Sequence, residues 1–208
     1  SKFKRTMTNK LLFFVLLALC FSGCDMLETH PYDVHITGER ELTNKNIQLI
    51  ENKMQGKKTI RFAMISDTQR WYNSTEDVVK ALNARGDIDF VIHGGDQSDF
   101  GVTKEFIWMR DIFNKFQMPY VCLLGNHDCL GTGEDAYRAI YGDPNFAFTA
   151  GNVRFICLNT NAMEYDYSEP VPDFNFIENE LNNLSPEIEK TVFAMHVKPF
   201  EFVFNNNV

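Results

Sequence analysis

The sequence predicts an α/β fold, and two patterns in its central part support that prediction. Short apolar runs, typical of buried strands, alternate with longer stretches whose apolar residues recur at helical spacing. Strand, helix, strand, helix and strand in this order are typical of a doubly wound α/β sheet. The strands are predicted at 60–65, 88–92 and 120–124, and the helices at 73–82, capped around 73–77, and at 103–116. Trp108 of the second helix is expected in packing or at a rim.

The pattern changes after residue 145. Apolar runs joined around Gly151-Asn152 predict a β-hairpin over 146–149 and 153–158. The long loop 159–172 carries acidic and tyrosine side chains, and two interpretations stay open: it lines a substrate cleft, or it is an exposed acidic connection. A helix over 173–184 and a strand over 191–195, ending at His196, complete the predicted elements.

Length and charge restrict the class of protein. The 208 residues suit one domain of ordinary size. The net charge is −8, from 20 basic and 28 acidic residues. This balance argues against a nucleic-acid-binding protein that works through a basic face. It suits a protein that gathers carboxylates around cations.

The amino-terminal segment predicts export. Basic residues precede the apolar run 11–19, which is shorter than the roughly 18 residues of a membrane-spanning helix and is typical of a secretory signal. Residues 21–24 resemble a bacterial lipobox, with Phe21 in place of the usual Leu, so that Cys24 would be cleaved and lipidated. The alternative is an ordinary signal peptide with an incidental cysteine. We expect an exported protein, lipid-anchored to a bacterial membrane and facing the periplasm or the exterior.

The domain organisation follows from that segment. We expect a lipoprotein signal peptide over 1–24, a tether with a helix at 45–54 over 25–57, and one enzyme domain over 58–208. His30 and His35 in the tether are expected at the surface.

Three cysteines remain outside the export segment, an odd number for a disulfide framework. Cys122 and Cys157 lie in strand patterns and are expected in the core. Cys129 is expected near the site as a structural thiol.

Polar side chains follow each of the three predicted parallel strands. Asp67, Asp96 and Asn126 come directly after them, spaced by roughly 30 residues, about one βαβ unit. The carboxyl ends of parallel strands form the binding crevice of such a sheet. A single Asp after a strand is usually a turn or helix cap. Three polar residues at matching positions after three strands, one of them in the string Gly125–Asp128, favour a metal site.

The chemistry of these residues suits phosphoryl transfer. Two divalent ions can share a carboxylate oxygen and stabilise both the attacking and the leaving oxygen. Asp96 suits the bridge, Asp67 the first ion, and Asn126 and His196 the second.

Other polar residues are assigned supporting roles. His127 could stabilise phosphoryl oxygens or protonate the leaving group, with Asp128 orienting its imidazole. We expect Asp99 to orient other site residues without binding an ion, and His93 to pack within its strand.

Four blocks of the chain resemble the calcineurin-like metallophosphoesterases over about residues 59 to 200. The blocks are 67–69, 95–99, 125–128 and His196. The resemblance implies a four-layer α/β/β/α sandwich, two divalent metal ions such as Mn, Fe or Zn, and hydrolysis of phosphomonoesters or phosphodiesters by metal-activated water. It also implies that Gln69 joins Asp67 at the first ion and that His127 is the catalytic histidine.

The chain departs from the family's pattern at two points. Gln69 stands where the family usually has His, and an amide oxygen is a weaker ligand than imidazole for late transition metals. No Gly-His-x-His block follows His196 before Val208. We therefore expect an amino-terminal fragment of a longer enzyme, with an incomplete second sheet, impaired metal binding and little activity.

Two other hypotheses remain. One is a non-catalytic lipoprotein binding module that retains the fold. The other is a metal-free α/β protein in which the Asp residues are ordinary caps. The sequence leaves the phosphoester substrate open.

Overall fold

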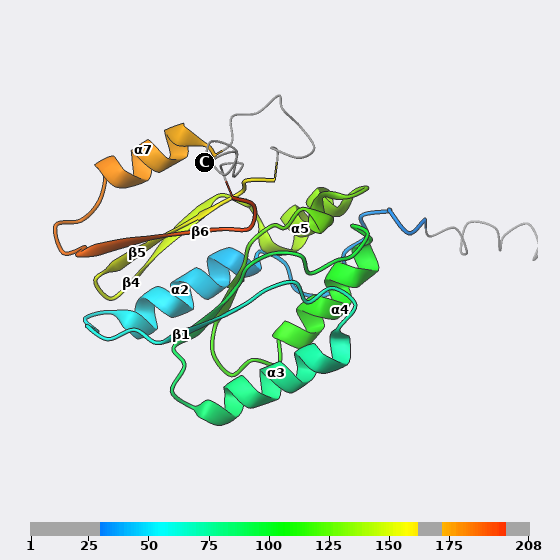
Figure 1. The fold of residues 1–208 in the computed structure, drawn as a ribbon, viewed down its shortest axis with the longest axis horizontal. Helices are drawn as coiled ribbons and strands as arrows, with labels where there is room; N and C mark the ends of the chain where they lie inside the picture. The colour runs from blue at the N-terminus through cyan, green and yellow to red at the C-terminus, as the bar shows by residue number, and fades with distance from the viewer. Residues whose placement is uncertain (1–29, 162–171, 199–208) are drawn as a thin grey trace, which may run out of the picture.

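The computed structural model describes residues 30–161 and 172–198 and shows two stacked β-sheets with helices on their outer faces (Figure 1). Each sheet has three strands within these ranges. The predicted α/β/β/α sandwich is confirmed. Most of the loop predicted over 159–172, and Cys24 of the lipobox, lie outside the described residues.

The first sheet is parallel, with its strands in the order of the sequence. It consists of β1 (Phe62–Ile65), β2 (Phe90–His93) and β3 (Tyr120–Cys122). Helices α3 (Tyr72–Arg85) and α4 (Thr103–Phe113) connect these strands and pack side by side on one face. Right-handed crossovers between successive neighbouring strands place both helices on the same side. The expectation of a doubly wound sheet is therefore wrong, because the other face is covered by the second sheet.

The second sheet contains the predicted hairpin. Strands β4 (Phe146–Ala150) and β5 (Val153–Leu158) are antiparallel, and β6 (Lys190–Met195) runs parallel to β5. The crossover helix α7 (Phe174–Asn182) covers the outer face. Arg154 on β5 holds it there through a 2.6 Å contact with Glu180.

Alternate side chains of the two sheets form the core between them. The rings of Phe148 and Phe155 are stacked at 4.9 Å, and Phe90 of the first sheet meets both edge-on. Each of these fully buried rings contributes about 1.5–3 kcal/mol through removal from water. The sheets are thereby fixed face to face, which determines where the ends of β2 and β6 meet.

Helix α2 (Leu42–Met54) begins before the predicted residue 45 and packs against β3 and β4. Ile50 and Met54 on it are fully buried in the core between the sheets. The residues before α2 are also fastened, since Arg110 of α4 donates to the Thr37 carbonyl at 2.6 Å. The segment expected as a tether and helix ahead of the domain thus contributes to its core from Ile36 onward.

A short 3-10 turn, η2 (His127–Cys129), and helix α5 (Gly133–Tyr141) follow β3. Cys122 and Cys157 are buried free thiols, as predicted. No helix within residues 30–161 and 172–198 is long and apolar enough to cross a membrane.

Candidate metal centre

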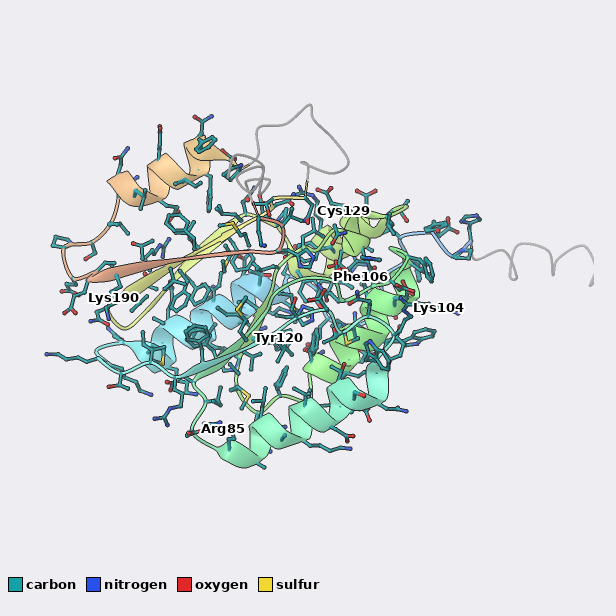
Figure 2. The ribbon with its side chains drawn as sticks, in the orientation of Figure 1. Arg85, Lys104, Phe106, Tyr120, Cys129 and Lys190 are labelled. Atoms are coloured by element: carbon teal, nitrogen blue, oxygen red, sulfur yellow. The ribbon has the colours of Figure 1, made fainter. Side chains whose placement is uncertain are left out.

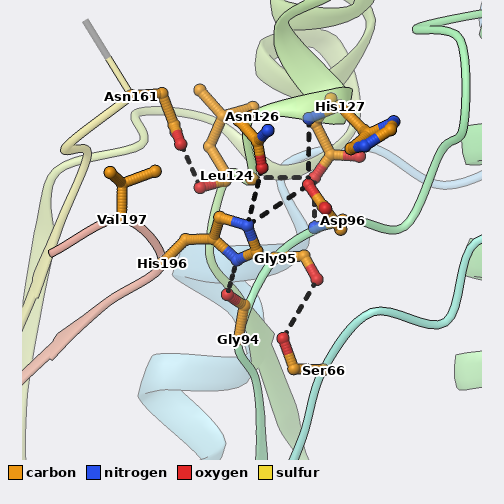
Figure 3. Close-up of polar contacts among 12 residues, drawn as sticks. Ser66, Gly94, Gly95, Asp96, Leu124, Asn126, His127, Asn161, His196 and Val197 are labelled. Carbon is orange, nitrogen blue, oxygen red and sulfur yellow. Dashed lines mark hydrogen bonds and ion pairs between the residues drawn. The ribbon is translucent and has the colours of Figure 1, made fainter. Parts of the chain in front are cut away.

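The loops after β1, β2 and β3 meet the end of β6 at one edge of the sandwich. One donor atom each from Asp67, Asp96 and His196 lie within 4.8 Å of one another. Asn126 Oδ1 lies 2.9 Å from His196 Nε2 (Figure 3). Gln69 Nε2 lies 3.5 Å from Asp96 Oδ2. The structure thus brings together all five side chains that the sequence predicted as metal ligands.

The loop at Asp96 depends on glycine for close approach. Gly95 has a φ of 104°, and a Cβ there would lie 2.7 Å from His196 Nδ1. Only glycine therefore allows the imidazole to reach the loop. Asp67 and Asp96 themselves have φ values of 56° and 62°. Left-handed backbone at a residue other than glycine costs on the order of 1–3 kcal/mol and concentrates at functional sites.

Asp96 is the most enclosed of the acidic ligands, with 3% of its surface exposed. Its Oδ1 accepts the backbone N–H of His127 at 3.0 Å and lies 3.4 Å from His196 Nε2. Burial by itself raises the pKa of Asp96, but these hydrogen bonds and the charge of His196 outweigh it, so the pKa lies below its usual value. Asp96 is therefore an ionised carboxylate at the centre of the cluster.

Both ring nitrogens of His196 face oxygen atoms. Nδ1 donates to the Gly94 carbonyl at 2.7 Å, and Nε2 faces Asn126 and Asp96. Burial lowers the pKa of His196, yet the contacts with Asp96 and the Gly94 carbonyl outweigh it and raise the pKa to about 9. The cluster of oxygens thus attracts positive charge, here supplied by a proton that a metal ion would displace.

Asp128 does not orient His127, contrary to the sequence-based expectation. Its fully buried carboxylate instead accepts four backbone N–H groups, at 2.8–2.9 Å. The donors are Asp96, Gln97, Ser98 and Gly125. Burial raises the pKa of Asp128 to about 7, against the lowering effect of these N–H groups. Asp128 therefore joins the loop after β2 to the loop after β3.

His127 is positioned by Asp99. Its Nδ1 lies 3.0 Å from the Asp99 carbonyl and 3.7 Å from Asp99 Oδ1. The Asp99 side chain is almost completely buried, and its Oδ2 pairs with Arg70 Nε at 3.1 Å. These contacts agree with the expectation that Asp99 orients another site residue.

Two further residues lie near the centre without facing it. His93 is buried, with Nε2 2.9 Å from Thr68 Oγ1 and its ring against Phe113, as predicted. Burial lowers the pKa of His93 to about 3, so its imidazole is neutral. Cys129 contacts the Gly125 carbonyl at 3.4 Å, and burial raises the pKa of its thiol. Both residues support the loops.

Two residues for which the sequence carried no prediction, Thr160 and Asn161, hold the centre from the second sheet. Thr160 Oγ1 donates to the Val197 carbonyl at 2.6 Å and accepts the Val197 N–H at 3.1 Å. Asn161 Nδ2 donates to the Leu124 carbonyl at 2.8 Å (Figure 3). Their signal was weak, since they are ordinary polar residues after a strand that belongs to no recognised block.

Comparison with known proteins agrees with this geometry. The family model described as calcineurin-like phosphoesterase matches residues 60–207. The chain belongs to this family. The 3',5'-cyclic-nucleotide phosphodiesterase alr5338 of Nostoc sp. (strain PCC 7120) is 27% identical over 124 residues, which are 59% of this chain and 46% of that protein.

A solved structure shares the fold. Purple acid phosphatase PPD1 from yellow lupin (Lupinus luteus) seeds aligns with a TM-score of 0.51 and 17% identity. The alignment covers 67% of this chain and 30% of that one. This calcineurin-like phosphoesterase chain thus spans less than half of either relative.

Proposed function

We propose that the chain hydrolyses phosphoric esters at a centre of two divalent metal ions. The observation that carries the proposal is the cluster of Asp67, Asp96 and His196, whose donor atoms lie within 4.8 Å of one another. The cluster lies at the carboxyl edge of the parallel sheet, where open α/β folds bind ligands. Family membership supports the class of reaction.

The residues fit such ions. Gln69 Oε1 is buried and, within the described residues, accepts no hydrogen bond, so it is free to act as an oxygen ligand. We assign Asp67 and Gln69 to one ion, Asn126 and His196 to the other, and Asp96 to both. Oxygen and imidazole donors of this kind suit Mn, Fe or Zn. Bound ions would neutralise phosphoryl charge and activate the attacking water.

The protein's own part in the reaction centres on His127. Nδ1 is held by the Asp99 carbonyl, which leaves Nε2 as the ring nitrogen available to the substrate. From there it can donate a proton or hydrogen bond to the leaving oxygen. Asp128 acts indirectly by fixing the loops that carry Asp96 and Asn126.

We also propose that the protein is exported and anchored through lipidated Cys24, which the lipobox-like residues 21–24 support. Mass spectrometry of the chain purified from bacterial membranes should show a diacylglyceryl-modified amino-terminal cysteine. A Cys24→Ala variant should leave the membrane fraction or retain its signal peptide; an unmodified wild-type cysteine would refute the anchor.

The test of the enzyme is metal content together with turnover of the full chain loaded with Mn²⁺ or Zn²⁺. Because the five proposed ligands lie together, we expect about two ions per chain and hydrolysis of p-nitrophenyl phosphate or bis(p-nitrophenyl) phosphate, in place of the impaired metal binding and little activity expected from the sequence. A 3',5'-cyclic nucleotide joins the panel, because the curated relative is named for that activity. Asp96→Asn should strongly reduce both readouts, and Asp77→Asn, an exposed residue on α3, should change neither. Tight phosphoester binding without turnover would instead identify a binding module.

A further inference from the structure

An exposed aromatic and basic surface lies beside the metal centre. We call it the rim surface, and it consists of Arg70, Trp71, Phe100, Lys104 and Trp108. The exposed fractions are 66% for Trp71, 57% for Phe100 and 51% for Trp108. Trp71 and Trp108 are the two tryptophans of the chain. Exposed apolar patches occur at sites of interaction with proteins, ligands and membranes.

One contact between the loops that precede α3 and α4, and one between the helices themselves, bring the residues of the rim surface into the same region. The Arg70 guanidinium pairs with Asp99 at 3.1 Å, and Trp71 and Phe100 are the next residues along each loop. Tyr72, after Trp71, meets Trp108 edge-on with ring centroids 5.7 Å apart. Since Asp99 also holds His127, the rim surface adjoins the catalytic end of the sheet.

Lys104 extends the rim surface along α4. It lies one helical turn before Trp108, on the same face of the helix. Figure 2 shows Lys104 at the opposite end of the molecule from Arg85 and Lys190, which mark the end of α3 and the start of β6.

The amino-terminal segment is fastened next to this surface. The Thr103 hydroxyl donates to the Asp33 carbonyl at 2.9 Å, and the Thr132 hydroxyl to the Tyr32 carbonyl at 2.5 Å. His30 lines a groove together with Lys104. Cys24 precedes His30 by only six positions, so even a fully extended chain spans about 20 Å. A lipid on Cys24 would therefore hold a bilayer near the rim surface.

The chemistry of the rim surface suits that bilayer. Tryptophan and phenylalanine rings partition to the boundary between acyl chains and headgroups, and Arg and Lys contact the phosphates there. The protein's net charge of −8 otherwise disfavours an anionic membrane, so a local aromatic surface that carries Lys104, beside Arg70 in its pair with Asp99, would select one orientation.

We propose that the rim surface rests on the phospholipid headgroup layer and that the site hydrolyses phosphoesters presented at that layer. The first part rests on the proposed lipid anchor, and the second on the proposed hydrolase function.

Tryptophan fluorescence tests the first part, because both tryptophans belong to the rim surface. The full chain, expressed with its export segment and purified from membranes, is reconstituted into vesicles of phosphatidylethanolamine and phosphatidylglycerol (3:1). Replacing these lipids by ones with brominated acyl chains should quench the emission at least twofold.

A relocated reporter provides the control. The triple variant Trp71→Phe, Trp108→Phe, Phe193→Trp moves the fluorophore to the outer side of β6, where Phe193 is 42% exposed. Its emission should not respond to the brominated lipid. If the wild type is not quenched, or if the wild type and the triple variant are quenched equally, the proposal that the rim surface contacts the membrane is overturned.

The second part is tested with two substrates. The double variant Phe100→Ser, Trp108→Ser should hydrolyse phosphatidylglycerol in vesicles at least tenfold more slowly than the wild type, while hydrolysis of soluble bis(p-nitrophenyl) phosphate is unchanged. Equal rates of the two proteins on vesicles would overturn the proposal. A raised KM of the variant for a soluble nucleotide, without quenching, would show instead that the rim binds soluble aromatic substrates. If the metal-loaded wild type hydrolyses neither substrate, the proposed hydrolase function fails, and the fluorescence result still decides membrane contact.

Discussion

The two sides of the proposed metal centre differ in how firmly the protein holds their side chains. On one side Asn126 and His196 are partly buried, and His196 is fixed by the Gly94 carbonyl and by Asn126. On the other side Asp67 is exposed, and the Gln69 side chain makes one hydrogen bond within the described residues, at 3.5 Å from its Nε2 to Asp96 Oδ2. Asp96 lies between them.

This difference predicts that the two sides bind metal ions with different affinities. Ligands that are already positioned lose less conformational entropy when an ion binds, so the Asn126–His196 side should bind first and more tightly. The Asp67–Gln69 side combines an exposed carboxylate with a weak amide ligand. We therefore expect unequal affinities for two ions of the same metal.

The largest effect should follow from removing the group that both sides share. Asp96→Asn should lower kcat/KM by about a thousandfold, because a neutral amide stabilises neither ion nor the developing charge. Steady-state kinetics of the Mn²⁺-loaded chain will measure this. Unchanged metal content and stability would support the hypothesis of a metal-free α/β protein.

The second-largest effect concerns Asp128, which joins the loop that carries Asp96 to the loop that carries Asn126. Asp128→Ala should reduce the free energy of unfolding by about 3 kcal/mol or more, because it leaves buried N–H groups without acceptors. Urea denaturation will measure it. Asp135→Ala, in the exposed first turn of α5, should have a much smaller effect; similar losses would contradict the bridging role of Asp128.

A glycine substitution separates backbone strain from crowding. Gly95→Ala should destabilise the protein by about 2 kcal/mol and weaken metal binding, because the methyl group would displace His196. The matched control is Gly86→Ala, which has a φ of 67° and open space around its Cβ, and should cost about 1 kcal/mol without affecting metal. Intact metal affinity in Gly95→Ala would show that the position of His196 is not critical.

The smallest expected effect is a decrease in the difference between the affinities for the two ions. Gln69→His should raise the affinity of the weaker site by about tenfold, since imidazole is the better ligand for Zn²⁺. Calorimetric titration of Zn²⁺ into wild type and variant will resolve two affinities. A change confined to the tighter site would reverse our assignment of Gln69.

Prediction from sequence succeeded where local pattern and chemistry coincide. The apolar runs before Asp67, Asp96 and Asn126 became β1, β2 and β3, and their spacing placed these side chains at one edge. The role of Asp128 could not be inferred in this way. Its acceptors face N–H groups about 30 residues earlier in the chain, and only the folded loops show that they meet.

The sequence by itself therefore determined the α/β class, the parallel strands and the polar residues at their ends, because strand periodicity and glycine turns are local properties. Only the tertiary structure decided that both connecting helices share one face, that α2 belongs to the core, and that Thr160 holds the chain after His196. These features depend on the packing of two sheets and on contacts between segments far apart in the chain, which no local pattern encodes.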